Sequence, residues 1–287
     1  MLITKIKETT KSFFKQREST LTNDQADIIT AYNSRSKPPS VIFYTTHKCA
    51  SVFVNNLLNR ITKHSDYQVK DYASAIWRLG NQIDVGSPYE NFLEEAYDQL
   101  YKTRGEIYAP QRKPLDFPGR EHLKHIFFLR DPRDVLVSAY YSFGYSHGIP
   151  KAEKQKKKFQ ETREKIRDQG IDDYACEAAM NWLLPLYNQY RYLLESSNSY
   201  LYLTYDNFKD DTNYFIHQIS DFLNVDVPEK EIQEIANEAS PVQKNQDIMR
   251  HKRSGLSQQY LQELESDTIQ KLNELFAEVL SYWKFTA

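Results

Sequence analysis

The sequence has few cysteines, almost no excess charge and no long apolar run. The two cysteines, Cys49 and Cys176, cannot build a disulfide framework and lack metal-ligand spacing, so we expect no metal site and a reducing compartment. Net charge is −2, from 37 Lys and Arg against 39 Asp and Glu, which gives no argument for binding nucleic acid. No apolar run reaches about 18 residues, and the N-terminus lacks the apolar core of a signal peptide. We therefore expect a cytoplasmic protein without membrane contact.

The composition is that of a folded globular protein. Hydrophobic residues make up 40% of the 287 residues and aromatic residues 14%, enough to fill a substantial core. Residues 1–38 are polar with scattered apolar positions, and they end at Lys37, Pro38 and Pro39. We expect an N-terminal helical extension over residues 1–38 and a single domain over residues 39–287.

One stretch, residues 41–61, combines a strand, a turn and a helix. Its first four residues form an apolar run of strand length, and Phe53, Leu57 and Ile61 recur at helical spacing. The turn, residues 45–51, carries Lys48 and small side chains, so its N–H groups and the helix N-terminus can face an anion. Glycine is absent from this turn, although the nucleotide-binding loop G-x-x-x-x-G-K-[ST] needs two glycines. The turn is therefore a candidate phosphate cradle of another kind.

The residues alone leave two other interpretations of this turn open. It is either an ordinary strand-to-helix turn with an exposed Lys48, or the site of a nucleophilic Cys49 whose pKa the helix N-terminus lowers.

A second strand, turn and helix begins at residue 125. The run H-I-F-F-L-R ends at Arg130, and Asp131 and Pro132 suit the start of a helix that carries Ser138. Arg130 and Ser138 can both lie beyond the same strand end. A salt bridge from Arg130 to a nearby aspartate is the competing interpretation.

Strands that alternate with helices predict a parallel sheet covered on both faces. Residues 200–205, Y-L-Y-L-T-Y, give a third strand, residues 106–108 a weaker one, and three prolines predict a loop over residues 109–119. Ligands of such sheets bind beyond the carboxyl ends of the strands, which places Lys48, Arg130 and Tyr205 on one rim. The charge-dense residues 149–169 are either a solvated helix face or a lid over an acidic substrate.

The order of these motifs resembles that of the PAPS-dependent sulfotransferases, in which PAPS is 3′-phosphoadenosine 5′-phosphosulfate and PAP its desulfated product. The resemblance runs from Val41 to about Tyr282 and rests on T-T-H-K-C-A-S-V-F, R-D-P-R-D-V-L-V-S-A-Y-Y-S-F, Y-L-T-Y-D-N-F-K-D-D and R-S-G. The most specific piece is the phrase R-x-x-x-D-V-x-V-S after a strand, which is complete here. The resemblance implies an α/β, three-layer P-loop-like fold with a central parallel sheet flanked by helices.

The resemblance also implies roles for particular residues. Arg130 and Ser138 would bind the 3′-phosphate, which distinguishes PAPS from ATP, and Tyr205 would contact the adenine. The family's K-S-G-T-T-W cradle aligns with Lys48, Cys49, Ala50, Ser51, Val52 and Phe53, and its R-K-G phrase with Arg253, Ser254 and Gly255. Lys48 would stabilise the leaving phosphate, the turn's amides would hold the 5′-phosphate, and Phe53 would share the stacking on adenine. Arg250 replaces Arg253 if the alignment is shifted.

The chain departs from the family at the catalytic base. Aligning Pro110 with the family's K-T-H-x-P phrase puts Glu106 at the Lys position and Tyr108 at the His position, so the usual base is missing. Glu106, His47 and Tyr108 are the three candidates. In the cradle, Ala50 replaces a glycine and Val52 a threonine.

The resemblance implies in-line transfer of a sulfuryl group from PAPS to a hydroxyl or amine of a small soluble acceptor, which needs positioning and charge stabilisation. Two rival functions remain: a P-loop kinase that uses ATP, and a non-catalytic homologue that only binds a nucleotide.

Overall fold

The structure is a computed structural model, and it describes residues 37–82, 93, 95–239 and 255–285. Residues 39–287 fall within one compact unit of the chain. The expected helical extension, residues 1–38, lies almost wholly outside the described residues.

The described residues form a five-stranded sheet in which every pair of neighbouring strands is parallel. The strand order is β2-β3-β1-β4-β5, so β1 lies at the centre. The chain builds one side of the sheet from β2 and β3 and then crosses to the other side for β4 and β5. The strands are β1 Val41–Thr45, β2 Gln68–Lys70, β3 Glu106–Gln111, β4 Lys124–Leu129 and β5 Tyr200–Thr204.

Alternate residues of the central strands fill two separate cores, one on each face of the sheet. In β1, Ile42 and Tyr44 point into one core, and Val41 and Phe43 point into the other. All four side chains are fully buried, as expected for a parallel sheet covered on both faces. The predicted α/β three-layer class is confirmed.

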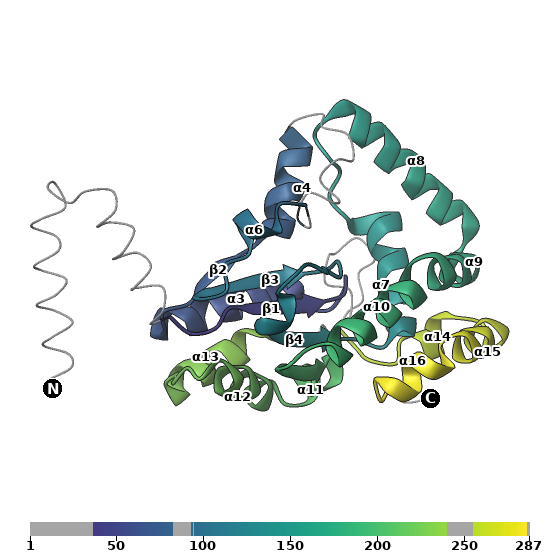
Figure 1. The fold of residues 1–287 in the computed structure, drawn as a ribbon. Helices are drawn as coiled ribbons and strands as arrows, with labels where there is room; N and C mark the ends of the chain where they lie inside the picture. The colour runs from purple at the N-terminus through teal and green to yellow at the C-terminus, as the bar shows by residue number, and fades with distance from the viewer. Residues whose placement is uncertain (1–36, 83–92, 94, 240–254, 286–287) are drawn as a thin grey trace, which may run out of the picture. The chain divides into compact units, whose positions relative to one another are not determined.

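Helices cover both faces. The core around Val41 is closed by α3, α12 and α13, and Figure 1 shows α12 and α13 side by side along the sheet. The core around Ile42 is closed by α7, α10 and the C-terminal helices.

The α-helices are α3 Ser51–Ile61, α4 Tyr72–Gln82, α6 Tyr97–Leu100, α7 Pro132–Tyr141, α8 Glu153–Gln169, α9 Ile171–Ala178, α10 Leu184–Glu195, α11 Tyr205–Asp210, α12 Thr212–Leu223, α13 Glu229–Ala239, α14 Tyr260–Glu263, α15 Ser266–Leu275 and α16 Ala277–Tyr282. The 3-10 turns are η1 Thr62–His64 and η2 Arg120–His122, and the π-helical turns are η3 Ser142–Ser146 and η4 Ala179–Leu183. In the described part of the chain, none of them has the length and apolar character to cross a membrane.

The start of the predicted loop over residues 109–119 is wrong, because β3 continues to Gln111 through Pro110. Proline cannot donate to a strand ladder, but β2 ends at Lys70 opposite Tyr108 and leaves Pro110 without a neighbour on that side. On the other side, the pairing of β3 with β1 shifts register at this point. This longer strand carries the following residue, Arg112, to the carboxyl edge of the sheet.

Candidate active site

The β1–α3 turn forms a compact cradle without glycine. Lys48 and Ala50 both have positive φ, at 66° and 45°, a left-handed conformation that costs a non-glycine residue roughly 1–2 kcal/mol. The first backbone bond of α3 runs from Val54 N to Ala50 O, at 3.1 Å. The amides of Ser51 and Phe53, like that of the residue between them, therefore have no partner within the helix and can face an anion. Backbone strain retained at such a position is typical of a functional site.

Arg130 lies directly after β4 and is buried, with only 4% of its surface exposed. Its Nη1 donates to the carbonyl oxygen of Lys48 at 3.1 Å, and its Nη2 donates to that of Leu256 at 2.7 Å. The guanidinium carbon lies 4.4 Å from the centre of the Tyr205 ring. Among the described residues, the buried Nε has no hydrogen-bond partner. An unpartnered buried donor is costly, and an anion at this position would satisfy it.

Asp134 gives partial support to the salt-bridge interpretation of Arg130. Its Oδ2 lies 3.6 Å from Arg130 Nη2, but its oxygens also accept hydrogen bonds from the backbone amides of Gln258, at 2.8 Å, and Tyr260, at 3.3 Å. Burial raises the pKa of Asp134, and the nearby Arg130 opposes that rise. Asp134 thus holds the chain after residue 255 against the strand end, and in the part of the chain that the structure describes it leaves Arg130 Nε without a partner.

Tyr205 and Gly255 meet on the far side of Arg130. The Tyr205 hydroxyl donates to the Gly255 carbonyl oxygen at 3.2 Å, and Gly255 has φ 69°, a conformation suited to glycine. The other two residues of the predicted R-S-G phrase, Arg253 and Ser254, lie outside the described residues, as does Arg250. Of this phrase, only Gly255 is therefore placed at the rim.

The remaining predicted cradle residues lie close to this rim. The Phe53 ring is half-buried, 4.8 Å from the ring of Phe208, which also packs against Tyr205 at 5.7 Å. Val52 points outward with 62% of its surface exposed, and Ser138 is half-buried on α7. Phe53 and Tyr205 therefore belong to one aromatic cluster, and their contact with an adenine stays a prediction.

Arg112 was not among the predicted site residues, yet it lies on the rim, directly after β3 and beside the β1–α3 turn. Its Nη2 donates to Ser51 Oγ at 2.8 Å, at the first residue of α3. The Tyr190 hydroxyl lies 2.9 Å from the carbonyl oxygens of both Arg112 and Thr45, and this ties the ends of β3 and β1 together. The sequence held one signal for it: if the K-T-H-x-P phrase ends at Pro114, its His position falls on Arg112.

Positive charge is concentrated at this rim, where Asp134 lies 3.6 Å from Arg130 Nη2. Burial, then Arg130 and then Arg112 lower the pKa of Lys48 to about 8. Burial also lowers the pKa of Arg112, and Asp71 opposes this effect. In the described part of the chain, neither Lys48 nor Arg112 has a carboxylate within 4.0 Å. Lys48 is therefore not the exposed lysine of an ordinary turn, because buried neighbouring cations disfavour its charge until an anion arrives.

His47 lies beside Lys48, between two aromatic rings. The ring centre of Phe143 is 6.2 Å away and that of Trp182 is 6.0 Å away, and these residues come from η3 and η4. Burial, followed by Arg112, Lys48 and His147, lowers the pKa of His47 to about 3. The imidazole is therefore neutral at physiological pH, and its lowered pKa makes it a weak base in the ligand-free protein.

Helix α8 holds the turn that carries Phe143. Arg163 on α8 donates to the Phe143 carbonyl oxygen at 3.1 Å, and Arg167 donates to that of Gly144 at 2.5 Å. These two arginines of the charge-dense residues 149–169 are thus bonded to η3, while most of the helix's other charged side chains are exposed. Whether α8 also acts as a lid stays a prediction.

Glu106 and Tyr108 do not lie at this edge, so the structure does not support either as the base. Glu106 is the first residue of β3, at the amino end of a parallel sheet, and its Oε2 lies 3.6 Å from Lys70 Nζ. Tyr108 is buried in mid-strand opposite Ile42, with its hydroxyl at the backbone of Lys102. Burial raises the pKa of Tyr108 well above its usual value. Both expectations came from ending the family phrase at Pro110, before the strand had reached the rim.

The structure contradicts a nucleophilic Cys49. Its side chain is fully buried and points away from the cradle, with Sγ 3.5 Å from the carbonyl oxygen of Phe128 in β4. Burial raises its pKa to about 12, and this outweighs the opposing effects of nearby hydrogen bonds and of Arg130. Cys49 is therefore a core residue, although its backbone belongs to the cradle.

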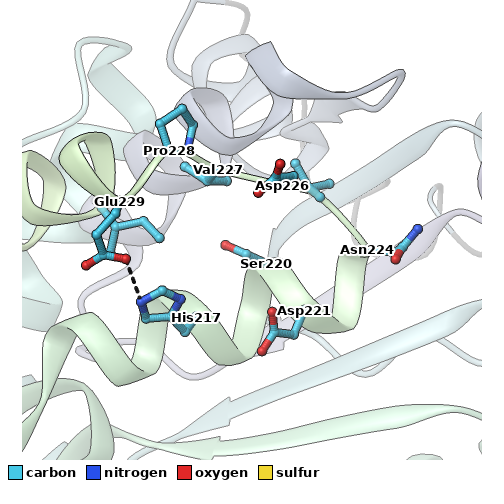
Figure 2. Close-up of a pocket in the computed structure, with 10 residues that line it drawn as sticks. His217, Ser220, Asp221, Asn224, Asp226, Val227, Pro228 and Glu229 are labelled. Atoms are coloured by element: carbon cyan, nitrogen blue, oxygen red, sulfur yellow. Dashed lines mark ion pairs between the residues drawn. The ribbon is translucent and has the colours of Figure 1, made fainter.

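A surface pocket shown in Figure 2 lies elsewhere, at the junction of α12 and α13. It is lined by His217, Ser220, Asp221 and residues 224–229 and 232, and His217 Nε2 lies 3.2 Å from Glu229 Oε2. Lys124, at the amino end of β4, donates to Phe222 O at 2.7 Å, so the end of α12 lies near the edge of the sheet opposite Lys48. We assign the pocket no role in the rim's chemistry. In the described part of the chain, no three His, Cys, Asp or Glu side chains gather as a metal site.

Comparisons with known proteins agree with this fold. Two solved structures share the fold: a mouse sulfotransferase, SULT7A1, complexed with PAP (15% identity, TM-score 0.52, 84% of each chain covered), and retinol dehydratase in a complex with retinol and PAP (14% identity, TM-score 0.50, 87% of this chain and 83% of the other covered). None of the curated proteins compared with the chain matches it. The family model of the sulfotransferase domain matches residues 38–284, nearly the whole described chain, and the chain therefore belongs to the sulfotransferase family.

Proposed function

We propose that this protein transfers the sulfuryl group of PAPS to a hydroxyl or amine of a small-molecule acceptor. The observation that carries the proposal is the order of cations along one edge of the sheet: Lys48 after β1 and Arg130 after β4, with a buried Arg130 Nε that no group of the described residues satisfies. Adjacent parallel strands present these cations to a single ligand with two separated anionic groups. PAPS has this chemistry, because its 3′-phosphate and its 5′-phosphosulfate are attached to different carbons of the same ribose.

The donor would lie across the rim with its 3′-phosphate at Arg130. Ser138 on α7 would supply a hydroxyl, and Tyr205 and Phe53 would flank the adenine. The 5′-phosphate would accept hydrogen bonds from the first amides of α3, where the helix dipole also favours an anion. The full set proposed to bind the donor is Lys48, Cys49, Ala50, Ser51, Val52, Phe53, Arg130, Ser138, Tyr205, Arg253, Ser254 and Gly255, with Cys49 acting through its backbone.

Lys48 would supply the main charge stabilisation in the transfer. The bond between sulfur and the bridging oxygen breaks, and its electron pair stays on the 5′-phosphate. Because the pKa of Lys48 is about 8, its amino group is protonated in most of the molecules at pH 7. A buried ammonium placed at the developing negative charge stabilises the transition state more than the ground state.

His47 is the residue at the rim that we propose as the base. It is neutral at pH 7, lies beside Lys48 and is positioned by Phe143 and Trp182. Burial is the largest cause of the lowered pKa of His47, and the donor's negative charges would offset the further effects of Arg112 and Lys48, so donor binding would raise the basicity of His47. The acceptor's proton would pass to this imidazole as the new bond to sulfur forms, a contribution of typically about 100- to 10,000-fold.

A small-molecule acceptor fits the site's surroundings. Aromatic side chains border His47, and retinol dehydratase, which shares the fold, binds retinol together with PAP. We also place the protein in the cytoplasm as part of this proposal, because the fold leaves Cys49 and Cys176 unpaired and does not depend on a disulfide.

Calorimetric titration with PAP, ADP and ATP tests the proposal. One to two charge-assisted hydrogen bonds to the 3′-phosphate should favour PAP over ADP by about 10- to 100-fold. The variant Arg130→Gln should lose this preference, whereas Arg191→Gln, which changes an exposed arginine on α10, should keep it.

The three nucleotides also separate the rival functions. Binding of ATP at least as tight as that of PAP would refute the sulfotransferase proposal and favour a kinase. Tight binding of PAP without transfer from PAPS to any member of a panel of phenols, alcohols and amines would identify a non-catalytic homologue.

A further inference from the structure

The geometry points to Arg112 as a catalytic residue that binds the sulfuryl group of the donor during transfer. This inference rests on the proposed function and adds a residue to it. Arg112 occupies the place where the family phrase, ended at Pro114, has its histidine. A permanent cation at that place cannot act as a base, so it serves a different purpose there.

The first argument is position along the rim. The strand order β3-β1-β4 puts Arg112, Lys48 and Arg130 at successive strand ends, with Lys48 in the middle. If the 3′-phosphate lies at Arg130 and the bridging oxygen at Lys48, the sulfuryl group extends from the bridging oxygen toward β3. Arg112 is the cation at that end.

The second argument is the state of the guanidinium. One of its nitrogens, Nη2, is anchored to Ser51 Oγ at 2.8 Å, and the Tyr190 hydroxyl anchors its backbone, so its orientation is fixed before a ligand binds. No carboxylate within 4.0 Å neutralises it in the described part of the chain, and Asp71, the acid that acts on it, is engaged with Asn55 Nδ2 at 3.3 Å and Ser74 N at 2.9 Å. A preorganised, half-buried cation without a counter-ion is suited to receive an anion.

The chemistry balances without a further reactant. The bond from sulfur to the bridging oxygen breaks and its electron pair goes to the phosphate oxygen beside Lys48. The acceptor's oxygen or nitrogen forms the new bond to sulfur and gives its proton to His47. The three sulfuryl oxygens carry negative charge, and the forked guanidinium of Arg112 binds two of them and thereby keeps the sulfur in line between the leaving oxygen and the acceptor atom.

Three variants and two nucleotides test this role. PAP lacks the sulfuryl group, so Arg112→Gln should leave the affinity for PAP within about threefold while weakening PAPS about tenfold. Single-turnover transfer to a panel of phenols, alcohols and amines should slow by about 100- to 1,000-fold. Arg112→Lys keeps the charge but not the fork and should fall between the parent and Arg112→Gln. Arg191→Gln is the control for loss of an arginine away from the rim.

A folding defect is separated by two further measurements. Removing Arg112 should raise the pKa of His47 from about 3, an effect seen by NMR titration without any donor. Ser51→Ala removes the anchor while keeping the charge and should slow transfer by about 3- to 10-fold.

Two outcomes would overturn the inference: PAP and PAPS weakened equally, which would make Arg112 a phosphate ligand only, or transfer by Arg112→Gln within threefold of the parent. If instead the parent protein does not prefer PAP to ADP, the proposed function itself fails.

Discussion

Replacing Lys48 with methionine should stabilise the ligand-free protein while abolishing transfer. The pKa of Lys48 falls from 10.5 in an unperturbed lysine to about 8 in the folded chain, and each pKa unit corresponds to about 1.4 kcal/mol. The protonated lysine therefore costs the folded state about 3 kcal/mol at neutral pH. Methionine has a similar length and no charge, and it keeps the left-handed backbone cost of position 48 unchanged, so Lys48→Met isolates the electrostatic cost.

The pH dependence fixes the sign of this effect. Because the folded chain binds its proton at position 48 more weakly than the unfolded chain, unfolding takes up a proton between about pH 8 and 10.5, and stability rises with pH across that range. The advantage of Lys48→Met should therefore be largest below pH 8 and should disappear toward pH 10.5.

Urea denaturation and thermal melting at several pH values measure the difference. For a domain of this size, a gain of about 3 kcal/mol raises Tm by at most about 6 to 12 °C. Lys157→Met, which changes an exposed lysine on α8, is the matched control. Addition of PAP should make the parent more stable than Lys48→Met, because PAP stabilises the parent through the lysine that the variant lacks. A ligand-free variant less stable than the parent at pH 7, or a difference that does not change with pH, would refute the reasoning.

Four further substitutions or reactions test the site. Ala50→Gly should raise the free energy of unfolding by up to about 1 kcal/mol, because glycine relieves the left-handed strain and loses part of that gain to entropy; denaturant titration measures it. Glu106→Gln should change the turnover of the folded enzyme by less than about threefold, because Glu106 lies at the amino end of the parallel sheet. A larger loss in steady-state assays would make Glu106 a candidate base again. His47→Asn should slow single-turnover transfer by about 100-fold or more while PAP affinity holds. Cys49 should resist iodoacetamide at pH 8 until the protein is unfolded, because burial raises its pKa to about 12; mass spectrometry detects the adduct.

Much of the fold could be predicted from the sequence because the residues of the strands form recognisable apolar runs. Residues 41–45 and 124–129 are short apolar runs bounded by polar turns, and alternation of strands with helices is enough to require a parallel sheet. The same reasoning placed Lys48, Arg130 and Tyr205 at one edge, since parallel strands share the edge at which they end. The structure brings these three residues together around the Arg130 guanidinium.

The two rejected bases and the missed arginine have one common cause, the end of β3. Prolines at 110 and 114 both fit the family phrase, and a proline ordinarily argues against a strand, so the sequence favoured an early end. Whether a proline is tolerated depends on what lies beside it, and the short β2 that frees Pro110 from a ladder bond is visible only in the fold. Tyr108 and Arg112 are four residues apart along the extended chain, a distance of about 13 Å, which is enough to separate the middle of β3 from the rim. Arg112 therefore reaches Ser51 while Tyr108 stays in the core, and which of the two residues lies at the rim follows from strand pairing and not from the motif.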